Sequence, residues 1–579
     1  MAQGNDDIVR DVGKWEWSEL WKKEDWWAIW LGFAILIIGL LIYVPRGPVS
    51  MESKIASANK ILKAESEKAP FRTIAWFKAS DAKGKLKATS SGAGKTIKKF
   101  TGKPHGWSSN PLDAFFMSDS KASAKAQKAV DKFEAAKEKE ASLLAAAMAA
   151  ENAASGESFK NNALNQKAIK AIGDWRFAIN KTSSAKKKAN AKGYNQIFYL
   201  IALMVITGVF FSIGRLVMGE NISKFLIGFV GVFLVAVLAY TLTAQSGIKS
   251  IGFGYPLWAI AIGMLISNTI GTPKWIEPAV QTEYYIKTGL VLLGAEILFG
   301  KILSIGVPGI FVAWIVTPIV LTTTYFFGQK IVKMPSKTLN VTISSDMSVC
   351  GVSAAIATAA ACRAKKEELT LAVGLSMVFT SIMMIAMPAF ITATGMHHVL
   401  GGAWMGGTID ATGAVAAAGA FLSDTAMYVA ATIKMIQNVL IGLVAFVVAL
   451  IWTTKIDKQA GQDVGMIEIW FRFPKFVLGF IAASIFFSLL YGSFGKDAGY
   501  TLLEHGAIRG GSRIFRGWFF CLAFSSIGLA TNFRELKSYF KGGKPLILYV
   551  CGQSFNLVLT LLMAYIMFFL VFPEITAQI

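Results

Sequence analysis

The chain has 579 residues, of which 54% are hydrophobic and only 16% are charged. Because an ordinary soluble domain carries roughly 25% charged residues, this composition excludes a soluble globular protein and predicts a chain that lies mostly in lipid. The formal net charge is +22, but the sequence has no nucleophile–base pair, disulfide framework or metal-ligand spacing, so we expect no enzyme, no cofactor and no nucleic acid partner.

The first hydrophobic stretch runs from Trp26 to Val44 and follows the leader WSELWKKEDWW. It lacks a small-residue cleavage site, and its aromatic flank is typical of an anchor at the membrane interface. We therefore expect residues 1–45 to form a leader and a retained transmembrane helix, with the N-terminus in the cytoplasm. A cleaved signal peptide is the alternative.

Residues 46–195 have the composition of a water-soluble insert. Between Arg46 and Lys192 there are about 29 basic and about 13 acidic residues, enough to dominate the chain's positive charge. Stretches rich in Ala, Lys and Glu favour helix, so we expect a mainly helical domain outside the membrane. One interpretation is a positive funnel that concentrates anions; the other is a solvated decoration.

Residues 196–579 are expected to form the membrane domain, because they contain most of the stretches that can cross about 30 Å of hydrocarbon. With Trp26–Val44, the candidate spans are Gln196–Met218, Lys224–Thr243, Tyr255–Ile270, Lys287–Leu303, Val307–Gly328, Leu369–Ile391, Tyr428–Thr453, Phe476–Tyr491, Trp518–Phe533 and Leu546–Phe572.

Loops rich in Lys and Arg orient these spans, because such loops stay on the cytoplasmic side. They follow Phe533 (Arg534, Lys537, Lys541 and Lys544) and Thr453 (Lys455, Lys458, Arg472 and Lys475). With these loops inside, the N-terminus is cytoplasmic, and the insert 46–195 and the C-terminus face the outside.

Two segments among the spans are too polar and too rich in small residues for ordinary membrane helices. They are SSDMSVCGVSAAIATAAAC, from Ser344 to Cys362, and GGTIDATGAVAAAGAF, from Gly406 to Phe421. Non-helical backbone at membrane depth is tolerated only beside protein or a water-filled cavity, and a pair of such segments indicates a transporter's binding site. The two alternatives are re-entrant segments and broken helices that cross the membrane.

A short sequence motif occurs twice in the membrane domain, once in each half. Gly294 to Phe299 is GAEILF and Gly528 to Phe533 is GLATNF. Each copy follows an apolar helix, and an odd number of crossings separates them, so the copies are predicted to point in opposite directions, as inverted repeats do.

The stretch from Pro256 to about Tyr549 resembles the YeiH-type putative sulfate exporter family of bacterial inner-membrane proteins. The resemblance is carried by LVLLGAEILF, the SVCGVSAAIATAAACRAKKEELTLAVG run, GGTIDATGAVAAAG, ATIKMIQNVL, FVLGF and IGLATNF. It implies a secondary transporter with inverted repeats, a mobile core and a fixed scaffold, which is usually dimeric. The chain departs from the family at Asp410, where relatives have His, and in its large basic insert.

The polar residues of the two unusual segments are the candidate binding site, together with a lysine inside an apolar helix. These residues are Ser344, Ser345, Asp346, Ser348, Gly351, Ser353, Thr408, Asp410, Thr412, Gly413 and Lys434. Hydroxyls and the N–H groups of half-helix N-termini suit an oxyanion. Asp346 or Asp410 would bind a coupling proton or sodium ion, or would cap a half-helix. Lys434 would pair with a carboxylate, bind an anion, or snorkel to a headgroup.

These features together predict an all-α polytopic membrane protein that transports a small anion, such as sulfate or a related oxyanion or organic anion. Coupling to a sodium or proton gradient and a homodimeric assembly in the lipid bilayer belong to this hypothesis. A sodium–proton exchanger, in which the carboxylates bind only cations, is the first alternative. A membrane-anchored sensor that binds a ligand with the basic insert is the second.

Overall fold

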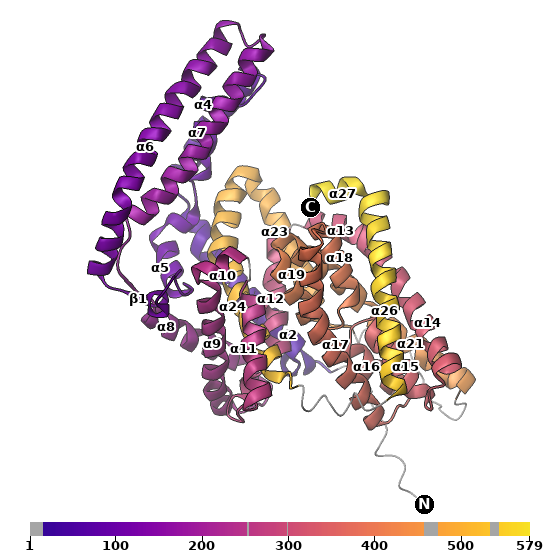
Figure 1. The fold of residues 1–579 in the computed structure, drawn as a ribbon. Coiled ribbons are helices and arrows are strands. Elements are labelled where there is room, and N and C mark those ends of the chain that lie inside the picture. The colour runs from indigo at the N-terminus through magenta and orange to yellow at the C-terminus, as the bar shows by residue number, and fades with distance from the viewer. Residues whose placement is uncertain (1–15, 252–253, 298, 457–472, 533–542) are drawn as a thin grey trace, which may run out of the picture. The chain divides into compact units, whose positions relative to one another are not determined.

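The computed structural model describes residues 16–251, 254–297, 299–456, 473–532 and 543–579. In these residues it is almost wholly helical, and the one sheet described joins two short strands, β1 Phe116–Met117 and β2 Tyr194–Asn195 (Figure 1). Eight described helices are long and apolar enough to cross a membrane. The prediction of an all-α polytopic membrane protein is therefore confirmed. Most of the basic loops that orient the spans, and Phe533 of the repeat, lie outside the described residues.

The chain divides into two compact units. Unit 1 is Met1–Leu36, Met204–Leu489 and Ser512–Ile579, and unit 2 is Ile37–Leu203 and Leu490–Gly511. Unit 2 thus contains the predicted insert and a second, distant segment of the chain. The helices α2, α8 and α23 run from one unit into the other.

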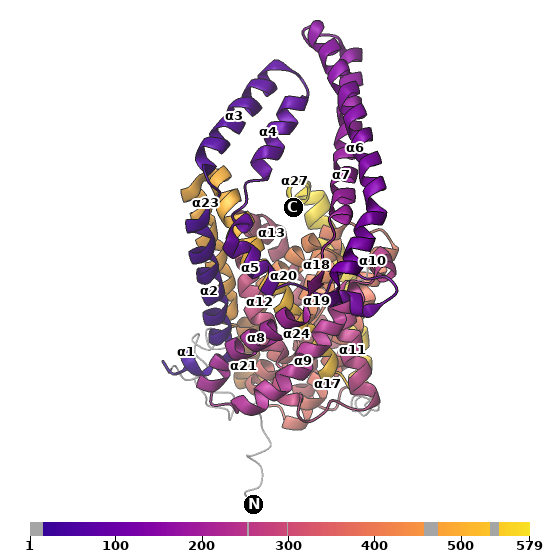
Figure 2. The same cartoon turned by 90° about the vertical axis from the view of Figure 1, so that its left-hand side faces the viewer.

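Unit 2 is built mainly from two helical pairs. Its elements are η1 Val44–Arg46, α3 Met51–Lys68, α4 Ile74–Gly84, η2 Ala88–Ser90, α5 Gly92–Phe100, η3 Pro111–Ala114, β1, α6 Asp119–Gly156, α7 Asn162–Ala189, β2 and η8 Tyr500–Ser512. Figure 2 shows α6 and α7 as two long helices side by side. Alanines such as Ala147 and Ala154 let them approach, and Ser118 and Asn161 cap their first turns.

Polar contacts tie the distant parts of unit 2 together. Asp497 accepts hydrogen bonds from Asn59 at 2.7 Å and from Lys83 at 2.6 Å, which joins α23 to α3 and α4. Near the short sheet, the hydrogen bond from Lys121 and the charge of Lys125 hold the pKa of the Asp113 carboxyl below its ordinary value. The described residues of the insert are therefore mainly helical, and they pack together with Leu490–Gly511 in unit 2.

Unit 1 contains most of the helices that are long and apolar enough to cross a membrane, and it shares α2, α8 and α23 with unit 2. Its elements are α1 Glu19–Lys22, α2 Glu24–Tyr43, α8 Ile197–Val217, α9 Ile222–Thr243, α10 Ser246–Ile251, α11 Tyr255–Thr269, η4 Glu277–Ala279, α12 Thr282–Glu296, α13 Phe299–Ile310, η5 Phe311–Ile315, α14 Val316–Phe327, η6 Gly328–Val332, α15 Lys337–Ser348, α16 Val352–Ala361, α17 Lys366–Ala393, α18 His398–Thr408, α19 Thr412–Leu422, α20 Asp424–Asn438, α21 Leu440–Ile451, η7 Trp452–Ile456, α23 Phe476–Gly499, α24 Arg513–Ala530, α26 Lys544–Tyr565, η10 Ile566–Val571 and α27 Pro573–Gln578.

Both unusual segments form helical hairpins. In the first, α15 and α16, Cys362 at the end lies beside Thr342 near the beginning, with Sγ and Oγ1 3.9 Å apart. In the second, α18 and α19, a Cβ on Gly401 would lie 3.2 Å from Leu422 at the other end. Each segment therefore folds back toward the end at which it began, which is the chain path of a helical hairpin.

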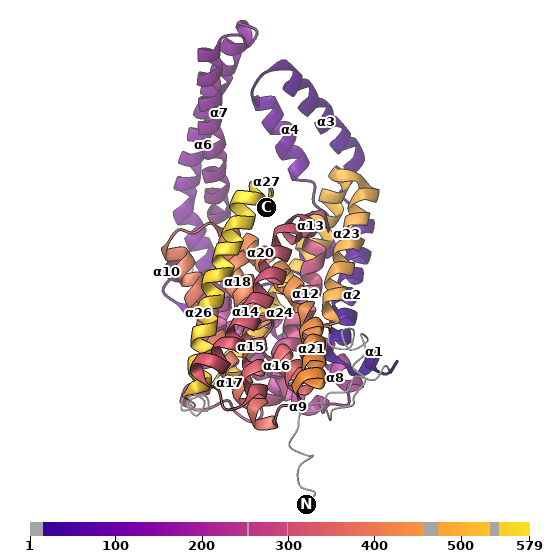
Figure 3. The same ribbon diagram turned by 90° about the vertical axis from the view of Figure 1, so that its right-hand side faces the viewer.

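The helix α17 separates the open ends of the two hairpins. Thr338 at the start of α15 donates a hydrogen bond to Glu368 in the first turn of α17, at 2.7 Å. At the far end of α17, Ile391 packs against Gly401 of α18. The hairpins therefore enter from opposite ends of α17, and their tips meet between them. Figure 3 shows α26 running alongside α15 and α18.

The two copies of the repeat lie in antiparallel helices that contact each other. Glu296 at the end of α12 forms a bidentate ion pair with Arg516 near the start of α24, at 2.7 and 3.0 Å. Both helices stop in the same way: Ile297 and Thr531 adopt extended backbone, and each N–H bonds to the glycine carbonyl three residues earlier. The predicted span Lys287–Leu303 is therefore wrong, because the helix ends at Glu296.

Side chains from neighbouring helices satisfy the backbone at both of these helix ends. The carbonyl of Ile297 accepts a hydrogen bond from Ser484 of α23, and the carbonyl of Thr531 accepts one from Ser267 of α11 at 2.6 Å. A buried carbonyl without a partner is costly in an apolar interior. These hydroxyls are therefore what allows the helices to end inside the protein.

The Gly294→Ala substitution should lower the stability of unit 1. A Cβ at this position would clash with the backbone of Phe480, which cannot rotate away as a side chain can. Overpacking of this kind costs about 1–3 kcal/mol, so we expect a lower midpoint of thermal unfolding in detergent. Gly300→Ala is the control, since its Cβ would meet no atom within 4 Å. Equal midpoints for the two variants would contradict this account of the packing.

Candidate functional site

The tips of the two hairpins touch inside unit 1. Sγ of Cys350 on the first tip lies 3.8 Å from Oγ1 of Thr412 on the second. Gly351 adopts a φ of 55° and a ψ of −128°, a conformation that side chains disfavour, and a Cβ there would lie 3.2 Å from Cβ of Asp410. The absence of a side chain at Gly351 therefore lets the tips meet.

The helix N-termini at the tips are uncapped. The cap positions of α16 and α19, Gly351 and Ala411, make no side-chain hydrogen bond to the first turn. The first N–H groups of a helix have no partner within the helix and carry a partial positive charge. The tips therefore present two sets of free N–H donors.

The helix C-termini at the tips, unlike the N-termini, have side-chain hydrogen-bond partners. In α15, the carbonyls of Met347, Ser348 and Val349 accept hydrogen bonds from Asn556, Gln437 and Lys434, at 3.1, 3.0 and 2.8 Å. In α18, the carbonyls of Gly407 and Thr408 accept from Gln437 and Gln553, at 3.2 and 2.8 Å. These side chains donate hydrogen bonds to the carbonyls at the negative ends of the half-helices. The negative ends therefore have side-chain partners, whereas the positive N-terminal ends have no side-chain cap.

A cavity of about 450 Å³ lies against the free N-termini, within the roughly 300–1,000 Å³ typical of small-molecule sites. Its walls come from both hairpin tips, α17, the first turns of α12, the end of α24 and the segment before α23. The lining residues used below are Asp25, Glu283, Lys287, Gly351, Val352, Ser353, Ser376, Met377, Thr380, Thr412, Gly413, Asn438, Phe473, Phe476, Ile527 and Thr531.

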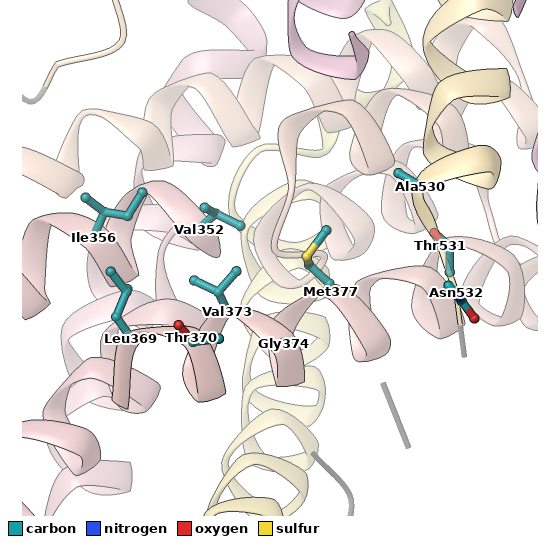
Figure 4. Close-up of a pocket in the computed structure, with 10 residues that line it drawn as sticks. All are labelled: Val352, Ile356, Leu369, Thr370, Val373, Gly374, Met377, Ala530, Thr531 and Asn532. Carbon is teal, nitrogen blue, oxygen red and sulfur yellow. The ribbon is translucent and has the colours of Figure 1, made fainter. Parts of the chain in front are cut away.

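A second cavity, of about 390 Å³, adjoins the first and shares Val352, Met377 and Thr531 with it. Figure 4 shows Val352 and Ile356 of α16 facing Leu369 and Val373 of α17, with Met377 between them and Thr531. This cavity follows α17 toward its first turns. Three exposed basic residues stand at the start of α17: Arg363 and Lys365 in the short loop before it, and Lys366 as its first residue.

Two buried carboxylates lie behind the tips. Asp410 accepts hydrogen bonds from the hydroxyl of Tyr549 and, at 3.5 Å, from Ser376. Asp346 is fully buried, and neither of its carboxylate oxygens has a hydrogen-bond partner among the described residues. Because Ser376 also lines the cavity, its hydroxyl connects the cavity to Asp410.

Lys434 is buried beside the carboxylates but forms no ion pair within 4 Å with either of them in the described structure. Its Nζ donates to the Val349 carbonyl at 2.8 Å and to Oε1 of Gln437 at 2.7 Å. The snorkelling alternative is therefore wrong, since only 1% of the residue is exposed. The ammonium group holds the first hairpin tip in place.

The sequence-predicted site residues fall into two groups. On the cavity wall lie Gly351, Ser353, Thr412 and Gly413. Behind the tips lie Ser344, Ser345, Asp346, Ser348, Thr408, Asp410 and Lys434. In this second group the hydroxyls bond within the protein: Thr408 donates to the carbonyl of Trp404 at 2.6 Å, and Ser345 accepts from Thr358 of α16 at 2.7 Å.

Several wall residues were not predicted from the sequence. Glu283 and Lys287 have the sequence context of interface or packing residues, yet both line the cavity, as do Ser376, Thr380 and Asn438. Oγ1 of Thr380 and Oδ1 of Asn438 are buried and have no hydrogen-bond partner in the described structure. Asn438 lies in ATIKMIQNVL, one of the motifs that carry the family resemblance, and this position is the sequence signal that could have identified it as a site residue.

Comparison with known proteins identifies the relatives of the chain. A UPF0324 membrane protein of Nitratidesulfovibrio vulgaris is 61% identical over 579 residues, which is 100% of both chains. A UPF0324 membrane protein of Rhodopirellula baltica is 57% identical over 65% of this chain and 69% of its own length. The UPF0324 inner membrane protein YeiH of Escherichia coli is 25% identical over 51% of this chain and 81% of its own. No solved structure matches.

The family model described as conserved hypothetical protein 698 matches residues 227–549. This range holds α12, both hairpins and α24, so it includes most of the cavity wall. The YeiH-type resemblance predicted from the motifs is confirmed, and the chain belongs to the UPF0324 family of membrane proteins.

Proposed function

We propose that this protein is a secondary transporter of a small anion, which binds in the cavity at the hairpin tips. The observation that carries the proposal is the contrast between the helix ends. The C-terminal carbonyls are filled by Lys434 and three side-chain amides, whereas the N-termini of α16 and α19 are uncapped and line the cavity. Free N–H groups and the positive helix ends favour an anion.

The arrangement around the cavity supports alternating access. On one side, the adjoining cavity extends along α17 toward Arg363, Lys365 and Lys366, whose charge would attract anions. On the other side, ion pairs connect the helices at the ends of α12 and α24 that lie away from the cavity. There Arg516 pairs with Glu296, and Arg513 contacts Asp424 of α20 at 3.1 Å. The antiparallel repeat helices are what an inverted-repeat transporter requires.

The buried carboxylates support coupling to a cation. Asp410 and Asp346 are costly in a membrane interior unless they bind a proton or a cation during the cycle. Asp410 reaches the cavity through Ser376. Binding of a proton or sodium ion there would offset the charge of the carboxylate while the anion occupies the tips.

Binding and flux of anions test the proposal. Purified protein should be stabilised by a subset of anions, by about 2.7 kcal/mol at a hundredfold excess over the dissociation constant. Thr412→Val should weaken this effect roughly tenfold, because a charge-assisted hydrogen bond is lost. Thr432→Val is the control, since Thr432 is buried in α20 and does not line the cavity.

Two outcomes would contradict anion transport, and a third would contradict the location of the site. Stabilisation by sodium or pH alone, with no anion effect, would favour the sodium–proton exchanger. Anion binding without flux in proteoliposomes would favour the membrane-anchored sensor. An anion effect that survives Thr412→Val unchanged would remove the tips as the site.

The proposal includes an inner-membrane location, with the insert outside and the loop before α17 in the cytoplasm, and a homodimer. Single cysteines replacing Lys121 and Lys366, in a Cys551→Ser background, test the orientation. An impermeant maleimide should label Lys121→Cys in intact cells but label Lys366→Cys only after permeabilisation. Labelling of both positions in intact cells would overturn the topology.

A further inference from the structure

The cavity has a second charged wall, opposite in sign to the helix N-termini. It is formed by the first turn of α12 together with Asp25 of α2, and it contains Glu283, Lys287 and Asp25. Nζ of Lys287 lies 2.9 Å from both Glu24 and Asp25 but 3.8 Å from Glu283. The lysine therefore has two close carboxylate partners, and Glu283 is only a distant third.

Glu283 is the unsatisfied member of this wall. Half of its side-chain surface, 50%, is open, and the residue lines the cavity. No hydrogen bond to its carboxylate is present in the described structure. Because Glu24 and Asp25 are the close partners of the Lys287 ammonium, the charge of the more distant Glu283 carboxylate is the least neutralised, and it repels an anion and attracts a cation.

The remaining wall residues suit a ligand that carries both charges. Phe476 presents its ring to Lys287, whose Nζ lies 5.9 Å from the ring centroid, so this wall already places an ammonium group near an aromatic ring, a contact that cations favour. Toward the hairpin tips, the unpartnered polar atoms of Thr380 and Asn438 are buried at the cavity. Met377 and Ile527 add apolar surface to the same cavity.

We infer that the transported ligand is a small organic zwitterion, whose anionic carboxylate or sulfonate binds at the N-termini of α16 and α19 and whose ammonium group binds Glu283. This inference rests on the proposed function and names the ligand class for the same cavity. The volume of about 450 Å³ suits an organic molecule of several heavy atoms. An inorganic oxyanion would satisfy the tips and leave Glu283 with only its 3.8 Å contact to Lys287.

Matched ligand pairs test the inference on the full-length protein. β-Alanine is compared with propionate, and 2-aminoethanesulfonate with ethanesulfonate, so that each pair differs only by the ammonium group; sulfate is the inorganic reference. We expect each zwitterion to bind roughly tenfold more tightly than its partner by calorimetry. In Glu283→Gln this advantage should vanish, and propionate should bind more tightly than in the unaltered protein because a repelling charge is gone.

The controls separate this inference from the proposed function. Glu277→Gln, an exposed change outside the cavity, should keep the zwitterion advantage, and Glu283→Asp should keep part of it if Glu283→Gln fails to fold. Simple anions that bind as tightly as the zwitterions would overturn the inference and leave anion transport standing. Failure of every ligand to bind would overturn both, and a preference that survives in Glu283→Gln would overturn the role of Glu283.

Discussion

Asp410→Asn should abolish the dependence of anion uptake on a cation gradient while leaving the fold intact. The amide has nearly the shape of the carboxylate and can still accept hydrogen bonds from Tyr549 and Ser376. It cannot take up a proton or neutralise a sodium ion. We expect gradient-driven uptake into proteoliposomes to fall at least about a hundredfold, because the coupling charge is removed outright.

Exchange of labelled for unlabelled anion should persist in the same variant, since exchange needs no net movement of the coupling cation. Glu277→Gln is the control, because Glu277 is an exposed carboxylate that does not line the cavity. Unchanged uptake with unchanged pH or sodium dependence in Asp410→Asn would reduce Asp410 to a capping or packing residue. Asp346, which has no hydrogen-bond partner among the described residues, would then be the remaining candidate.

The sequence predicts those parts of the fold that depend on local composition. The spans at α17 and α20–α21 are long and apolar, so length and hydropathy are enough to find them. The hairpins are recognisable because polar and small residues interrupt an apolar region. Their tips are predicted only approximately, because each half-helix continues into the segment until Val349 or Ile409 ends it.

Features that depend on tertiary contacts escape sequence analysis. The helix end at Ile297 has no proline or glycine at the break and is stabilised by Ser484, far away in the chain. In the sequence, Glu283 has the context of a residue at the membrane interface. Only the folded chain brings the end of α24 and the hairpin tips around it, so that it lines a cavity. Likewise, Lys434 donates to the carbonyl of Val349. This carbonyl can accept the hydrogen bond because α15 ends at Ser348.

Gly351→Ala should remove anion binding, because the glycine sets the geometry of the first hairpin tip. At φ 55° and ψ −128°, a residue with a Cβ is strained by about 1–3 kcal/mol. The new Cβ would also lie 3.0 Å from Oγ of Ser376 and 3.2 Å from Cβ of Asp410. Relief of this strain would separate the tips and turn the first N–H groups of α16 away from the cavity.

Two measurements check this expectation on the same preparation, and they distinguish lost binding from lost folding. The midpoint of thermal unfolding without ligand should fall by a few degrees, because roughly 1–3 kcal/mol is small beside the stability of a large domain. The additional stabilisation by a bound anion should disappear, because it depends on donors from both tips at once. Gly306→Ala is the control: its Cβ would be 3.8 Å from Ile436, an ordinary contact in a helix. If Gly351→Ala kept the full anion effect, the approach of the two tips could not be the basis of the site, and the N-terminus of α19 alone would have to account for binding.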